Sequence, residues 1–202
     1  MKKNIFLMTL MLMISQLTVV KAQDARKVLD KCAETVSSKD GVSASFSMES
    51  AQYGTASGTI AVKGKKFHAS TSVASIWFDG KTQWTYLHSN NEVSVTTPTD
   101  AQLQAINPYN FINLYKSGYK YTMTTTSSAY NVHLTADDSK RKIQELFITV
   151  DKKLSVPTEV KLRQGSKWTT FVIRNFKQNV LSDTEFRFNT KDFPTAEVID
   201  LR

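Results

Sequence analysis

Cysteine is almost absent from this sequence, which has one, Cys32, in 202 residues. A lone cysteine cannot form a disulfide within the chain, so the fold must be stable without such a cross-link. Cys32 falls on the apolar side of a predicted helix, where a free thiol usually behaves as a small buried hydrophobic group. We therefore expect Cys32 to lie in the core and not to be a reactive site.

Proline and glycine are scarce as well, with four and seven residues, and they are not gathered into a linker. The sequence also contains no internal repeat and no low-complexity tract, so there is no reason to divide the chain. A length of about 180 residues after position 22 is enough to bury one sizeable core. We expect residues 23–202 to form a single domain.

Long apolar runs are confined to the first 22 residues. Two lysines precede a mostly apolar stretch, residues 5–20, which is interrupted by four polar residues, and Val20-Lys21-Ala22 supplies small residues before Gln23. This pattern is typical of a cleaved secretory signal peptide, and it is short and polar for a membrane-spanning helix of about 20 apolar residues. We expect residues 1–22 to be removed on export. Because position 23 is not cysteine, we expect the mature chain to carry no lipid of its own.

Charge of one sign does not dominate. Without the three lysines of residues 1–22, 23 basic residues stand against 18 acidic ones, a net charge of +5. The basic residues are scattered, and the chain is expected to be exported, so nucleic acid is not expected as a partner. The moderate basic excess fits either a solvated surface or docking to acidic surfaces of partner proteins.

Catalytic and metal-binding signatures are also missing. His68, His88 and His133 fall on separate segments and show no metal-ligand spacing. The sequence has no glycine-rich phosphate loop, G-x-S-x-G elbow or H-E-x-x-H motif. Asp137-Asp138 lies just before three basic residues and is typical of a charged hairpin tip. We expect no enzymatic activity, no cofactor and no metal site.

Apolar residues at helical spacing open the predicted domain. Ala25, Leu29, Cys32 and Val36 recur every three or four positions, which predicts a helix that ends before Gly41. One-sided alternation of apolar and polar residues then predicts strands. The alternating sets are Val42 to Met48, Ile60 and Val62, Trp84 and Tyr86, Val93 and Val95, Tyr119 to Met123, Tyr130 to Leu134, Leu146 to Val150, and Val160 and Leu162.

These strands predict an antiparallel sheet with one polar face, although periodicity does not separate a single sheet from two packed sheets. The middle of the chain interrupts them. Thr99 to Gln102 forms a capping box that opens a short helix, and Asn107-Pro108 begins a second one that ends at Gly118. These helices either pack on the sheet or cover a cavity as a lid, whose residues would be Leu103, Ile106, Phe111, Leu114 and Tyr115.

The segment Phe78-Asp79-Gly80-Lys81-Thr82-Gln83-Trp84-Thr85-Tyr86 is the most specific local pattern. It resembles the S-D-G-K-T-x-W-x-Y hairpin of the periplasmic outer-membrane lipoprotein carriers, the LolA family. Weaker resemblances are Val42 to Phe46, Gly58 to Lys63, Phe186-Arg187-Phe188 and Glu197 to Asp200. The order of the predicted elements also agrees, so the resemblance covers nearly the whole mature chain.

The resemblance implies an α+β, mainly β fold. This fold would be an incomplete antiparallel β-barrel, a strongly curved single sheet closed by the N-terminal helix and the lid helices around an apolar cavity. It also implies a soluble, monomeric periplasmic carrier that shields the acyl chains of lipoproteins. The partners would be an inner-membrane ABC-type releasing complex and an outer-membrane acceptor. The alternative is a lipid-binding or lipid-sensing protein of the same fold for a glycolipid, a fatty acid or a pigment lipid.

The alternating strands and the resemblance together give the expected ligand site. The residues expected to line one concave apolar face are Phe46, Met48, Ile60, Val62, Phe67, Trp84, Tyr86, Val93, Tyr121 and Met123. The chain departs from the family at Gly64-Lys65-Lys66, where carriers commonly have Arg-Pro and the arginine is thought to hold the lid closed. Lysine lacks the planar fork of donors that arginine has, so Lys65 or Lys66 would be an imperfect latch.

Overall fold

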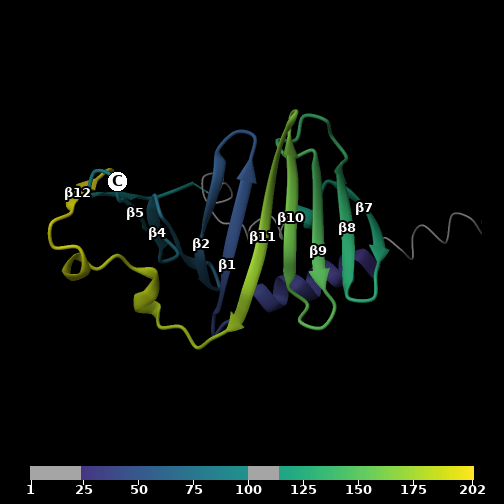
Figure 1. Cartoon of the computed structure of the whole chain (residues 1–202), viewed down its shortest axis with the longest axis horizontal. Helices are drawn as coiled ribbons and strands as arrows, with labels where there is room; N and C mark the ends of the chain where they lie inside the picture. The colour runs from purple at the N-terminus through teal and green to yellow at the C-terminus, as the bar shows by residue number, and fades with distance from the viewer. Residues whose placement is uncertain (1–23, 100–113) are drawn as a thin grey trace, which may run out of the picture.

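The computed structural model describes residues 24–99 and 114–202. The strands of these residues form a single strongly curved sheet (Figure 1). The predicted lid residues Leu103, Ile106 and Phe111 lie outside the described residues. The strands are β1 (Val42–Ser50), β2 (Gly54–Lys63), β3 (Lys66–Thr71), β4 (Ala74–Phe78), β5 (Gln83–Leu87), β6 (Glu92–Thr96), β7 (Tyr119–Thr125), β8 (Ala129–Ala136), β9 (Glu145–Asp151), β10 (Pro157–Gln164), β11 (Lys167–Gln178) and β12 (Glu197–Asp200).

All of these strands belong to one 12-stranded sheet, in the order β12-β6-β5-β4-β3-β2-β1-β11-β10-β9-β8-β7. Neighbouring strands are antiparallel, except that β12 pairs with β6 in parallel. The two ends of this order, β12 and β7, do not pair, so the sheet is open. The structure therefore decides between the two arrangements that periodicity left open, in favour of a single curved sheet.

A helix over residues 24–36 packs on one face of the sheet, which we call the inner face. The apolar side of the helix, with Ala25, Leu29, Cys32 and Val36, joins a core cluster with strand residues such as Val42 and Leu146. Because side chains alternate along a strand, directly paired residues share a face, and the register extends the inner face from strand to strand. The predicted helix and the core position of Cys32 are both confirmed, since its side chain is 0% exposed.

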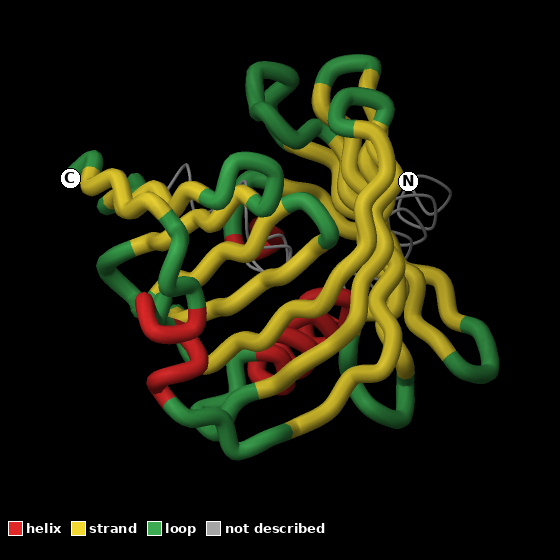
Figure 2. Tube along the Cα trace, turned by 60° about the vertical axis from the view of Figure 1, so that its left-hand side comes forward, coloured by secondary structure: helices red, strands yellow, loops and turns green. Residues whose placement is uncertain are grey.

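The outer face carries the last part of the chain. Residues 179–200, which we call the strap, contain two short 3₁₀ helices, η2 (Asp183–Phe186) and η3 (Thr190–Asp192), followed by β12. Figure 2 shows the helix of residues 24–36 behind the strands and the two strap helices in front of them. Phe186 of the strap is 0% exposed and lies outside the core cluster under the helix. The sheet therefore has apolar packing on both of its faces.

Packing on both faces explains which strands the sequence pattern did not reveal. In β4, Ile76 and Phe78 lie on the inner face, while Trp77 on the outer face is also buried. In β11, Phe171 and Ile173 face inward next to the outward-facing Val172. A strand that is apolar on both faces loses the alternation of apolar and polar residues by which a half-buried strand is recognised.

Gly58 permits a close approach between two neighbouring strands. A Cβ atom at this position would lie 1.9 Å from the Ser70 backbone oxygen of β3 and 2.9 Å from the Ser70 carbonyl carbon. Backbone atoms cannot move away as the end of a flexible side chain can, so any other residue would push β2 and β3 apart. Gly58 pairs with Phe46 of β1, so this contact also affects the inner face.

We predict that Gly58→Ala destabilises the fold by about 1–3 kcal/mol, the usual cost of forcing extra atoms into a packed region. Urea-induced unfolding measures the change. Ser57→Ala is the matched control, because Ser57 is exposed on the same strand, and we expect it to change stability by less than about 0.5 kcal/mol. Equal stabilities for the two variants would show that β2 and β3 separate at no cost.

We also predict that Cys32 reacts with thiol reagents only when the protein opens. Burial raises the pKa of the Cys32 thiol to about 12, so the native protein holds roughly a thousandfold less thiolate than an unfolded chain at mildly alkaline pH. The stabilising effect of the neutral thiol is complete below its unfolded pKa and is lost as pH rises through the folded value. Alkylation followed by intact mass checks this, and native labelling as fast as that in guanidinium chloride would contradict it.

Candidate functional site

The residues predicted to line a ligand site do not all lie on one face of the sheet. Seven of the ten lie on the inner face, as the register of β1, β2, β3 and β7 requires. These seven are Phe46, Met48, Ile60, Val62, Phe67, Tyr121 and Met123. Three of them, Ile60, Val62 and Phe67, are at most 2% exposed and belong to the core packed under the helix.

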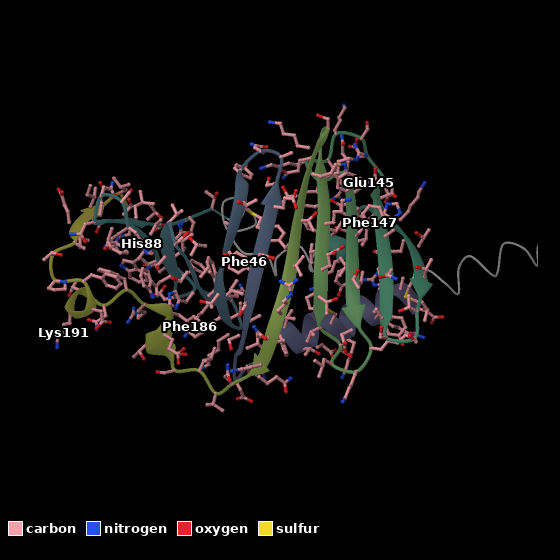
Figure 3. The ribbon with its side chains drawn as sticks, in the orientation of Figure 1. Phe46, His88, Glu145, Phe147, Phe186 and Lys191 are labelled. Atoms are coloured by element: carbon pink, nitrogen blue, oxygen red, sulfur yellow. The ribbon has the colours of Figure 1, made fainter. Side chains whose placement is uncertain are left out.

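The other four keep accessible surface on the inner face. Phe46, Tyr121 and Met123 are partly buried against the core cluster, and Met48 is partly buried two residues from Phe46 along β1. Figure 3 labels Phe46 on β1, near the middle of the strand order. These residues keep apolar surface at two places on the inner face, on β1 and on β7, with buried core residues on the strands between them. Two methionines and two aromatic rings give this surface adaptable shape, because methionine has three rotatable bonds and a polarisable sulfur.

The sequence pattern missed two residues of the same surface. Phe171 of β11 pairs with Met48 of β1, and Tyr130 of β8 packs against the core cluster on the inner side. Tyr130 lay within a predicted strand, so its alternation with Val132 was the signal that would have found it. Phe171 had no such signal, because the neighbouring Val172 hides the alternation of β11.

A cavity of about 440 Å³ lies at the far end of β1 and β2. Met48 and Ala56, a pair across these two strands, are among the residues that line it, together with outward-facing residues such as Glu49 and Ser57. Most of the lining, including Ser47 and Val172, points outward, so the cavity lies mainly on the outer face near the ends of β1 and β2.

Trp84, Tyr86 and Val93 lie on the outer face, which corrects their predicted position. Phe78 belongs to the inner core and pairs with Gln83, so the next residue of β5, Trp84, must point to the other side. Tyr86 follows on the same side as Trp84, and each pairs with a valine of β6, Val93 or Val95. The predicted Asp79-Gly80 turn is confirmed, with φ +100° at Gly80. The turn sets the register, and the register places the aromatics outside.

Of these outward-facing residues, Tyr86 forms part of an aromatic cluster with the strap. The ring centroids of Tyr86 and Phe193 are 4.7 Å apart. The Trp77 ring centroid lies 5.6 Å from that of Phe188 and 5.7 Å from that of Phe193. His68 stacks on Trp77 at 4.9 Å, and burial lowers its pKa. A groove of about 780 Å³ lies between these rings and the strap. The aromatics of the hairpin therefore hold the C-terminal segment in place.

The carboxylate of Asp79 ties the hairpin turn to the strap. Its Oδ1 accepts hydrogen bonds from the backbone N–H groups of Lys81 (3.0 Å) and Thr82 (2.9 Å), and its Oδ2 accepts one from Arg187 Nε at 3.1 Å. Partial burial opposes ionisation, but these hydrogen bonds outweigh it and hold the pKa of Asp79 below its usual value.

The lysines considered as a lid latch contact the strap or the solvent. Lys66 Nζ lies 2.6 Å from Asp183 Oδ2, and Lys63 Nζ lies 3.0 Å from Asp183 Oδ1 and donates to the Leu181 carbonyl oxygen at 2.7 Å. Lys65 is exposed in the turn between β2 and β3. Lys63 and Lys66 pair with each other and, by the register, point to the outer face. Lys66 therefore forms its ion pair with Asp183 of the strap.

Two of the five predicted lid residues are described, and they are not equivalent. Leu114 is partly buried, whereas Tyr115 is 0% exposed and belongs to the core cluster. The Tyr115 hydroxyl donates to Asp30 Oδ1 of the helix at 2.5 Å, and the Tyr115 carbonyl oxygen accepts a hydrogen bond from Tyr121. Burial, together with the Asp30 carboxylate, raises the pKa of Tyr115. Tyr115 therefore anchors the start of β7 to the helix.

Titratable groups on the outer face of β8 to β10 are paired with one another. Glu145 accepts hydrogen bonds from Arg163 Nη2 (2.5 Å) and lies 3.2 Å from His133 Nε2, and the Arg163 hydrogen bond is the main cause of its lowered pKa. Phe147 stacks on His133 with ring centroids 4.0 Å apart. Within residues 24–99 and 114–202, no cluster of His, Cys, Asp and Glu side chains is arranged to hold a metal ion. Over these same ranges, no helix is long and apolar enough to cross a membrane.

Comparison with known proteins places this geometry in a family. Residues 15–166 match the family described as "Outer membrane lipoprotein carrier protein LolA". An uncharacterized conserved protein from Thermus thermophilus has a similar structure, with a TM-score of 0.60 at 12% identity, over 88% of this chain and 99% of that one. This likeness supports the fold. No curated protein matches the sequence.

Two further solved structures are more distant. A LolA superfamily protein from Nitrosomonas europaea is 12% identical, with a TM-score of 0.43, over 81% of this chain and 97% of that one. LprF from Mycobacterium bovis is 6% identical, with a TM-score of 0.48, over 81% of this chain and 98% of that one.

We predict that the attachment of the strap to the hairpin turn depends on pH. Asn at position 79 keeps the turn acceptor but loses the charge that faces Arg187, so Asp79→Asn should lower stability at neutral pH by up to about 1 kcal/mol. The folded pKa of Asp79 is depressed, so this contribution is complete above about pH 4 and is lost as pH falls through the folded value. Urea unfolding of wild type and variant across this range measures it.

A double-mutant cycle with Arg187→Gln isolates the charge pair from other effects of the substitution. The coupling between positions 79 and 187 should disappear at acid pH together with the stability difference. A difference that stays constant with pH would mean that the variant perturbs the turn itself.

Proposed function

The chain belongs to the outer membrane lipoprotein carrier protein LolA family, and on this basis we propose that it is a periplasmic carrier of acylated lipoproteins. It would hold their acyl chains on the inner face of the sheet and carry them from the inner membrane to the outer membrane. An inner-membrane ABC-type complex would release the cargo to it, and an outer-membrane acceptor would take the cargo over. Binding and transfer of this kind require no catalytic residue.

The observation that carries the proposal is the apolar area that Phe46 and Met48 on β1 and Tyr121 and Met123 on β7 leave accessible. It lies on the inner face of an open sheet, continues from the core and remains partly exposed. A closed core would leave no such surface, and a surface meant only for water would be polar. The predicted lid residues Leu103, Ile106 and Phe111 belong to this proposal as a cover over the same face.

The energy of the cargo explains why a carrier needs such a surface. An acyl chain of about 15 methylenes costs on the order of 12 kcal/mol to expose to water, at roughly 0.8 kcal/mol per methylene. A lipoprotein with several acyl chains therefore needs a shield to cross an aqueous compartment. Release requires that the shield does not bind too rigidly, which favours methionine and aromatic side chains over a tightly interlocked pocket.

We predict that Phe46→Ala weakens binding of a fluorescent fatty-acid probe by about tenfold or more, which corresponds to about 1.4 kcal/mol. The matched control is Phe147→Ala. Phe147 is the same residue type on the same sheet, but it points to the outer face, where its side chain is 37% exposed (Figure 3). We expect the control to bind the probe as the wild type does. Binding titrations and melting temperatures of both variants separate a loss of ligand contact from a loss of stability.

Equal affinity of the two variants, or failure of the wild type to bind the probe, would contradict the proposed inner-face site. Mass spectrometry of lipids that copurify with the exported protein then identifies the cargo class. Acylated lipoprotein supports the carrier role, whereas a glycolipid, free fatty acid or pigment lipid would replace it with the alternative role of the same fold.

A further inference from the structure

One buried polar atom on the inner face has no partner. Gln83 is 8% exposed, and its Nε2 donates to Thr85 Oγ1 at 3.1 Å. Among the described residues, its Oε1 is the only buried side-chain nitrogen or oxygen without a hydrogen-bond partner. A polar group that is buried loses its hydrogen bonds to water, which costs free energy unless a protein group replaces them. Buried polar groups are therefore normally hydrogen-bonded, and an exception requires an explanation.

The register shows where this oxygen lies. Gln83 pairs with Phe78 of β4 and with Thr96 of β6, and Phe78 belongs to the core cluster under the helix. Gln83 therefore shares the inner face with the apolar surface of Phe46 and Met48. The hydrogen bond from Nε2 to Thr85 holds the amide group, so the unpartnered carbonyl oxygen has a defined position.

The inner face is divided into an apolar part and a polar end. From β4 through β1 and β11 to β7, its side chains are mostly apolar. On β5 and β6, the same face carries Gln83, Thr85, Ser94 and Thr96, as the cross-strand pairs require. Of the large apolar residues of these two strands, Trp84, Tyr86, Val93 and Val95 point outward, whereas Leu87 shares the inner face with Gln83 and Thr85. A ligand that lies along the inner face would therefore meet hydrocarbon contacts first and hydroxyl and amide groups at one end.

We propose that the cargo is amphipathic and that Gln83 Oε1 accepts a hydrogen bond from a donor group next to its acyl chain, an amide N–H or a hydroxyl. This inference rests on the proposed function. A carbonyl oxygen can accept a hydrogen bond but cannot donate one, so an ester group or an ionised carboxylate does not pair with it. An acyl chain linked through an amide supplies the donor at the boundary between the apolar chain and the polar part of the cargo.

The test compares probes that differ by one donor. N-methylpalmitamide has one N–H, and N,N-dimethylpalmitamide has none, while their acyl chains are identical. In competition with a fluorescent fatty acid, the wild type should bind the N–H probe about tenfold more tightly. In Gln83→Leu, which removes the acceptor and keeps a side chain of similar size, this preference should fall to about twofold or less.

Two controls make the result specific. Phe46→Ala should weaken both amides by similar factors and keep the preference, because it removes hydrocarbon contact only. Gln83→Leu should unfold at a higher urea concentration than the wild type, because it no longer buries an unpartnered oxygen. A second pair, 1-hexadecanol and hexadecyl methyl ether, shows whether a hydroxyl satisfies the acceptor as an amide does.

The outcomes separate this inference from the proposed function. If the wild type binds both amides equally, or if Gln83→Leu keeps the full preference, the assignment of Gln83 is wrong although the carrier role stands. If no acyl probe binds at all, the carrier role itself fails. A preference for the amide pair alone assigns amide-linked acyl chains as cargo, and a preference in both pairs assigns any donor beside the chain.

Discussion

The packing of one helix against the inner face of an open sheet is the interaction on which the rest of the structure depends. The described helix, residues 24–36, is about 20 Å long at 1.5 Å per residue, whereas twelve strands extend over about 50 Å at 4.8 Å per strand. One such helix covers only part of the face. Ile60, Val62 and Phe67 are buried as core, while Phe46 and Met123 on the same face keep accessible surface. The candidate site is thus the part of the inner face that the helix core does not fill.

The outer face has a corresponding cover, and this cover decides how the hairpin is used. The strap crosses β3 to β6, its Phe193 meets Tyr86, and its Arg187 meets Asp79 in the turn. Lys66, at the start of β3, pairs with Asp183 of the strap. The hairpin that most resembles the carrier family therefore contributes stability on the outer side and, through Gln83, polarity on the inner side.

The proposed carrier would have to bind apolar chains firmly and still release them, and the inner face has features that suit both needs. Methionine and aromatic side chains adapt to different chains without a fixed shape. In the proposal, the Gln83 acceptor beside Thr85 would add direction at one end, because a hydrogen bond depends on geometry and a hydrophobic contact does not. In the proposed mechanism, the apolar part supplies most of the affinity and Gln83 orients the cargo.

The sequence by itself determined the helix, most of the strands, the core position of Cys32 and the family, because period, composition and turn residues are local properties. It also determined that Trp84 and Tyr86 share one side of their strand. Only the tertiary structure decided which side of the sheet that is, because the four-residue turn at Asp79 pairs Phe78 with Gln83 and so turns Trp84 outward. The tertiary structure also decided the positions of β4 and β11. Each has apolar residues on both faces, and the second face is explained only by the strap or by a neighbour far away in sequence. A period of two assigns residues to one side of a strand, whereas register and packing between distant segments assign that side to the core, the ligand or the solvent.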